Sequence, residues 1–263
     1  METATSLRAL GKTTGKPLIE IPQVVPTIGF VNDYFDGEEF VNEFNGRTLS
    51  DYDNAGALRV LSYNGEIVKG SNPFAVVLAN QIAEQAGLRV AKQSDLEKAM
   101  NLGAMNFAGT YEDTGLVVRS EEDKDRKENT YLAQNLTNQI RARLGKKSKL
   151  PVMLPLVGLR LVKDTNSQYG LAFELKENAE IIYAPILSKE GSFSSEDINA
   201  ETGLPNKLTG GNRNLYTRSS GLSGLVLGRG FGLYSRYEVL ASSYENGRVV
   251  FVSGEASAQK ISK

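Results

Sequence analysis

Apolar residues recur at helical spacing between residues 72 and 87. Asn72 followed by Pro73 has the form of an N-cap with proline at the first helical position, and Gly87 supplies a stop. The apolar residues that share one face of this segment are Phe74, Val77, Leu78 and Ile82. This spacing is typical of an amphipathic helix, so the pattern predicts a helix that begins at Pro73 and ends before Gly87.

Two further helices are predicted downstream. Ser94 and Glu97 form a capping box that opens a short helix, which ends at Gly103. Apolar side chains at every fourth position from Leu132 to Leu144 predict a third helix, which ends at Gly145. Basic residues gather at the carboxyl end of this helix, where cations complement the helix dipole.

A tight turn with strand signals on both sides lies between the acidic N-terminal region and the first helix. Asn64-Gly65 is a pair favoured by type I′ turns, and residues 58–63 and 66–68 flank it. We therefore predict a hairpin here. A separate strand is predicted over 116–118, followed by a polar loop over 120–128.

From residue 150 onward the pattern changes to strands. A polar loop is expected over 188–208, and a glycine-rich segment follows over 210–237. The predicted strands are Val152–Leu156, Leu159–Val162, Leu171–Leu175, Glu180–Pro185 and Arg248–Val252. We predict an α+β fold, with a mixed α/β N-terminal half followed by a largely β C-terminal half.

The predicted organisation is one continuous globular unit with polar ends. Prolines at positions 17, 22 and 26 exclude a helix and allow an extended edge segment. The acidic run from Asp33 to Asp53 is expected to be rich in turns. The expected regions are a flexible tail over 1–16, a mixed α/β region over 17–149, a β-rich region over 150–255 and a polar tail over 256–263.

The amino-acid composition excludes several kinds of functional site but says little about the fold. The chain of 263 residues contains no Cys, His or Trp, and its formal net charge is −1. Disulfides, zinc sites built from thiolate or imidazole, and nucleophiles activated by histidine are therefore excluded, and a metal ion would need oxygen ligands. We expect no cofactor and no membrane contact. The polar N-terminus, which lacks an apolar leader, favours a cytoplasmic location.

The glycines from Gly228 to Gly232 suggest the phosphate-binding turn of a dinucleotide fold. The third glycine falls one position short of that fingerprint, and too little chain follows to complete such a sheet. A βαβ unit would make the segment after Gly232 a helix. Asn246-Gly247 instead permits a hairpin, which would make 238–244 a strand. The sequence leaves both interpretations open.

The strongest candidate for a binding surface is a basic, aromatic, glycine-rich segment over 207–237. From Thr202 to Tyr237 the chain contains no Asp or Glu. Arginine matches phosphate oxygens, and aromatic rings offer stacking platforms for bases. The candidate ligand-binding residues are Arg213, Tyr216, Arg218, Arg229, Phe231, Tyr234, Arg236 and Tyr237. The leading hypothesis is a non-catalytic binding protein for single-stranded nucleic acid or a similar polyanion, with affinity that falls steeply as salt is added.

Three alternatives stay open. The basic segment could pack against the acidic run 33–53 of the same chain and bind no partner. The same two regions could dock between copies of the chain, as in a self-assembling structural protein. An enzyme could use carboxylates and an oxygen-bound metal such as Mg²⁺. The carboxylates available to such an enzyme are Asp33, Asp36, Glu38, Glu39, Asp51 and Asp53.

Overall fold

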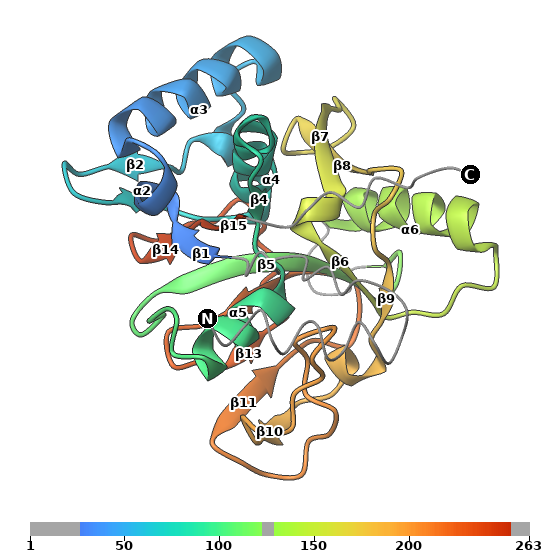
Figure 1. Ribbon diagram of the computed structural model, residues 1–263. Coiled ribbons are helices and arrows are strands. Elements are labelled where there is room, and N and C mark those ends of the chain that lie inside the picture. The colour runs from blue at the N-terminus through green and yellow to red at the C-terminus, as the bar shows by residue number, and fades with distance from the viewer. Residues whose placement is uncertain (1–26, 123–128, 254–263) are drawn as a thin grey trace, which may run out of the picture. The chain divides into compact units, whose positions relative to one another are not determined.

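A mixed eight-stranded sheet forms the centre of the structure, a computed structural model that describes residues 27–122 and 129–253 (Figure 1). Its strands follow the order β10-β11-β13-β12-β5-β6-β9, and β14 also pairs with β5. Most neighbours are antiparallel, but β13 runs parallel to β11, and β14 runs parallel to β5. The strands are β5 (Tyr111–Val118), β6 (Val152–Pro155), β9 (Ile182–Tyr183), β10 (Gly191–Phe193), β11 (Arg213–Tyr216), β12 (Leu222–Leu227), β13 (Leu233–Tyr234) and β14 (Gly247–Arg248).

The two ends of the described chain meet in a second, three-stranded sheet. β1 (Thr27–Phe30) pairs antiparallel with β15 (Val250–Ser253), which in turn pairs with β4 (Arg89–Val90). Residues 27–253 form one compact unit. Two antiparallel ribbons complete the β structure: β2 (Ser62–Tyr63) with β3 (Val68–Lys69), and β7 (Leu159–Lys163) with β8 (Leu171–Leu175).

Helices cover both faces of the large sheet. Figure 1 shows α3, α4 and α6 on one side of β5 and α5 on the other. The α-helices are α2 (Val31–Tyr34), α3 (Gly37–Tyr52), α4 (Pro73–Ala83), α5 (Gln93–Asn101) and α6 (Thr130–Leu144). Short 3₁₀ turns are η1 (Gly56–Leu58), η2 (Glu84–Ala86), η4 (Leu156–Gly158) and η5 (Pro185–Ser188).

Alternation along β5 divides the apolar interior into two cores. Side chains of a strand point to opposite faces in turn. Leu116 and Val118 therefore join the core that contains α3, α4, α6 and the β7–β8 ribbon. Val117 joins the opposite core, where α5 contributes Leu96 and Ala99. A strand with a core on each face is buried along most of its length, as β5 is.

The structure confirms the predicted α+β class and most of the predicted elements. The helix at 73–83 is capped by Asn72, whose Oδ1 accepts a hydrogen bond from Ala75 N at 2.8 Å. The third helix, the hairpin around Asn64-Gly65 and the four strands predicted between residues 152 and 185 are all present. The expected tails and the proline-containing segment 17–26 lie outside the described residues.

The acidic run from Asp33 to Asp53 is helical, so the prediction of a turn-rich segment was wrong. Asp36 caps α3 by accepting hydrogen bonds from the backbone N of Glu38 and Glu39, both at 3.0 Å. Carboxylates are favoured in the first turn of a helix because of its dipole. The helix then buries Phe40 and other apolar residues on one face.

Two local predictions downstream also need correction. Helix α5 begins at Gln93 rather than after a Ser94 cap, and Asp95 supplies the capping carboxylate by accepting from Lys92 N at 2.7 Å. Residues 228–232 form a turn between β12 and β13, closed by a hydrogen bond from Gly228 N to Gly232 O. Neither the βαβ helix nor a strand over 238–244 forms, because this segment is irregular.

Candidate functional site

Arg213 is buried in an ion pair that joins α5 to β11. Its two terminal nitrogens each lie 2.7 Å from a carboxylate oxygen of Glu97, and both side chains are about 5% exposed or less. The remaining donor, Nε, bonds to Phe231 O at 2.6 Å. A guanidinium with these partners stabilises the fold and is not accessible to a ligand.

Arg218 and Phe231 are also occupied by contacts within the protein. Arg218 Nη1 lies 3.9 Å from Glu238 Oε2. Phe231 occupies a left-handed backbone conformation in the turn after β12, and its half-buried ring packs against the core around α5. Neither Arg213 nor Arg218 pairs with the acidic run 33–53, since Arg213 faces Glu97 and Arg218 faces Glu238.

The structure brings three predicted tyrosines together in a row. The parallel register of β11 and β13 sets Tyr216 opposite Tyr234, with ring centroids 4.9 Å apart and planes 22° apart. The ring of Tyr237 stacks on that of Tyr234 with 5.8 Å between centroids. The guanidinium of Arg236 lies 4.8 Å from the ring centroid of Tyr216. We call Tyr216, Tyr234 and Tyr237 the tyrosine row.

A cavity of about 520 Å³ lies beside the tyrosine row. This volume is within the range of small-molecule sites. Arg229 lies at the cavity, where its exposed guanidinium donates to Asn246 Oδ1 at 2.6 Å. The strands β5, β12 and β13, the start of α4 and the irregular segment 237–244 supply the lining. The polar and aromatic lining residues are Tyr111, Asp113, Arg229, Tyr234, Tyr237, Glu238, Ser242 and Tyr244.

Asp113, a residue that is only 8% exposed, lines this cavity. Its Oδ2 accepts a hydrogen bond from Ser71 Oγ at 2.5 Å. Burial raises the pKa of Asp113 to about 7, although the bond from Ser71 opposes the rise. A buried carboxyl with a raised pKa in a cavity is a common feature of functional sites.

Glu112 precedes Asp113 on β5 and is buried as well. Its Oε1 accepts a hydrogen bond from Thr110 Oγ1 at 2.5 Å, whereas Oε2 is buried and accepts none from the described residues. Burial raises the pKa of Glu112 to about 8. Tyr111, which lines the cavity, donates to Ser71 O at 3.0 Å, and burial raises its pKa to about 12.

Arg119, at the end of β5, is buried without an ion pair among the described residues. Its guanidinium donates to Leu187 O at 2.7 Å, to Ser223 Oγ at 2.9 Å and to Ser235 Oγ at 2.7 Å, and it also bonds to Thr217 Oγ1. Burial and the nearby charge of Arg218 lower the pKa of Arg119 to about 9, so it stays charged at neutral pH.

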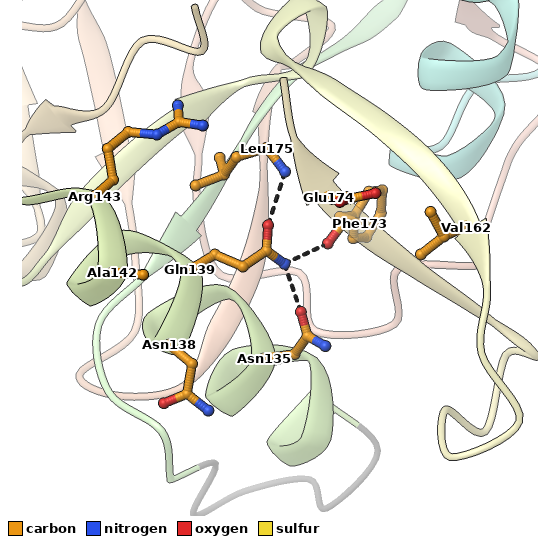
Figure 2. A pocket seen from close by; sticks show the side chains of 9 residues that line it. All are labelled: Asn135, Asn138, Gln139, Ala142, Arg143, Val162, Phe173, Glu174 and Leu175. Carbon is orange, nitrogen blue, oxygen red and sulfur yellow. Dashed lines mark hydrogen bonds between the residues drawn. The ribbon is translucent and has the colours of Figure 1, made fainter. Parts of the chain in front are cut away.

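A larger groove of about 740 Å³ lies between α6 and β8 (Figure 2). Figure 2 shows the amide of Gln139 turned toward β8, where it donates to Phe173 O at 2.9 Å and accepts from Leu175 N at 2.8 Å. The Gln139 amide thus forms hydrogen bonds with backbone groups at the edge of the β7–β8 ribbon. Glu174 pairs with Arg160, whose hydrogen bond lowers the pKa of Glu174. We therefore assign the candidate site to the smaller cavity.

Three of the carboxylates considered for a metal-dependent enzyme make hydrogen bonds within their own segment, and Asp53 pairs with Lys163. Asp33 accepts from Phe30 N, Asp36 caps α3, and Asp51 accepts from Ser50. In residues 27–122 and 129–253, no group of three or more Asp or Glu residues is arranged to hold a metal ion. No helix in the same part of the chain is long and apolar enough to cross a membrane.

The sequence interpretation did not single out Asp113 or Arg119. The sequence does mark these residues, because Glu112 and Asp113 place charges inside the strand-like run 111–118 and Arg119 directly follows it. Charged side chains in a buried strand need a specific partner or a role. Comparison of the chain with family models, curated protein sequences and solved structures gives no match.

Glu112 and Asp113 should make the protein less stable as the pH rises. Their raised pKa values mean that the folded protein holds protons that the unfolded chain loses, so the free energy of unfolding falls between about pH 4 and about pH 8. Replacing both by amides (Glu112→Gln with Asp113→Asn) should flatten this decrease and stabilise the protein near the upper limit by roughly 2 kcal/mol or more. Urea unfolding across this range measures the effect. The exposed Glu201→Gln serves as control, and an unchanged slope in the double variant would contradict the assignment.

Lysine should not substitute for Arg119. An ammonium keeps the buried charge but cannot reach acceptors on four separate segments, so Arg119→Lys should lower the free energy of unfolding by roughly 2 kcal/mol or more. The matched change at an exposed arginine, Arg59→Lys, should stay within about 0.5 kcal/mol of the parent protein. Denaturant unfolding compares the two variants, and equal stability would refute the role given to Arg119.

Proposed function

We propose that the cavity beside the tyrosine row binds a nucleotide unit, either within single-stranded nucleic acid or as a free nucleotide. The observation that carries the proposal is the stacked row itself, which borders a cavity of suitable size. Tyr237 is 47% exposed, so part of its ring is open to a further stacking partner. Stacking of a base on an aromatic side chain contributes about 1–3 kcal/mol and accepts every base.

Two arginines remain for phosphate groups. Arg229 and Arg236 are exposed at the cavity and at the tyrosine row, whereas Arg213 is buried with Glu97. Each phosphate neutralised on a single strand contributes about −0.7 to the slope of log affinity against log salt concentration. Two contacts give a slope of roughly −1.4, which is shallower than the dependence expected for four arginines.

Binding of a single-stranded RNA hexamer, followed by fluorescence anisotropy at low salt, tests the proposal. Tyr237→Leu should weaken binding by about fivefold or more, because the exposed stacking surface is lost. The control is Tyr183→Leu, which removes a similarly exposed tyrosine (52%) from β9, outside the cavity lining. Equal affinity of these two variants, or absence of binding by the parent protein, would refute the proposal.

The salt titration separates phosphate contacts from stacking. Arg229→Gln should reduce the magnitude of the salt slope by about half and weaken binding to every oligomer alike. Arg59→Gln, which changes an exposed arginine outside the cavity lining, should leave both quantities unchanged. A slope that Arg229→Gln does not alter would exclude this residue as a phosphate contact.

A further inference from the structure

The carboxyl group of Asp113 has one oxygen committed to the protein and one directed to the cavity. Ser71 donates to Oδ2, and among the described residues no donor bonds to Oδ1. Oδ1 lies beside Gly224, a second residue of the cavity lining. Oδ1 is not among the fully buried atoms that lack a hydrogen bond, so a ligand in the cavity that donates to Oδ1 would replace water there.

Gly224 keeps Oδ1 open. A Cβ atom built on Gly224 would stand 3.8 Å from Oδ1 and 3.7 Å from Pro73 Cγ, which are ordinary contact distances. The protein could therefore hold an alanine here without a clash, but the methyl group would occupy space that a ligand needs in order to reach the carboxyl group. The glycine provides access rather than a backbone conformation, since its φ is not in the left-handed region.

Bases differ in the hydrogen-bonding groups that their Watson–Crick edges offer to a carboxylate. An ionised carboxylate only accepts hydrogen bonds. Guanine presents two adjacent donors, N1–H and the N2 amino group. In uracil the one donor, N3–H, lies between two carbonyl oxygens, which a carboxylate repels. Hypoxanthine has N1–H but lacks the amino group, so it separates the contributions of the two donors.

We propose that Asp113 makes the cavity selective for guanine: its open oxygen, Oδ1, accepts hydrogen bonds from both the N1–H and the N2 amino group of a base that stacks at the tyrosine row. This inference rests on the proposed function, because it assumes that the cavity holds a base. Two other charged residues line the cavity: Glu238 faces Arg218, and Arg229 is available for the phosphate. The site then combines a stacking surface common to all bases with one group that distinguishes them.

Trinucleotides with one variable base test the selectivity, since a single guanine cannot form quadruplexes. The probes are the RNA sequences UGU, UUU and UIU, where I is inosine, measured by anisotropy near pH 8 so that Asp113 is ionised. UGU should bind about tenfold or more tighter than UUU, with UIU between them. Asp113→Asn should remove most of this difference, because it weakens UGU binding and relieves the repulsion between the carboxylate and the carbonyl oxygens of uracil. Equal binding of UGU and UUU by the parent protein refutes selectivity but leaves the proposed function standing, whereas no binding of any probe refutes both.

A second variant keeps the test decisive if Asp113→Asn does not fold. Gly224→Ala should weaken UGU more than UUU, because the added methyl group screens Oδ1 without removing the carboxyl group. The matched control is Gly46→Ala, on the exposed face of α3, where a Cβ atom meets nothing within 4 Å. If the two alanine variants bind UGU equally well, access to Asp113 does not determine binding, and the inference fails.

Discussion

The structure depends on a buried positive charge that is solvated by uncharged groups. Arg119 is 6% exposed, yet its partners are backbone carbonyls and the hydroxyls of Thr217, Ser223 and Ser235. A charge removed from water is costly unless hydrogen bonds replace its hydration. Those bonds come from β12, from residues that directly follow β11 and β13, and from η5, so the cost is met only when these four segments are in their native positions.

The hydrogen bonds of Arg119 are coupled to the cavity because successive side chains along a strand point to opposite faces of the sheet. Each hydroxyl partner of Arg119 is adjacent in sequence to a residue of the opposite face: Thr217 follows Tyr216, Ser235 follows Tyr234, and Ser223 precedes Gly224. Neighbouring residues of an extended chain point to opposite sides. The hydrogen bonds of Arg119 therefore fix, from the opposite face, the segments that carry the tyrosine row and Gly224, the glycine beside Asp113.

Local signals were sufficient to predict much of the fold but little of the site. The helix after Asn72 was predictable because cap, proline and apolar face are contiguous in sequence. Helix α3 was missed because its acidic residues, such as Asp36, are typical of turns as well as of first helical turns. The fate of Arg213 and the environment of Asp113 depend on Glu97 and Ser71, which are distant in sequence, so no local pattern could reveal them.

Intermolecular nuclear Overhauser effects report whether a base stacks at the tyrosine row. With a saturating trinucleotide, we expect cross-peaks between base protons and the ring protons of Tyr237, and none to the exposed ring of Tyr183. Saturable binding without cross-peaks to Tyr237, or with contacts confined to other aromatic rings, would show that the base does not stack there.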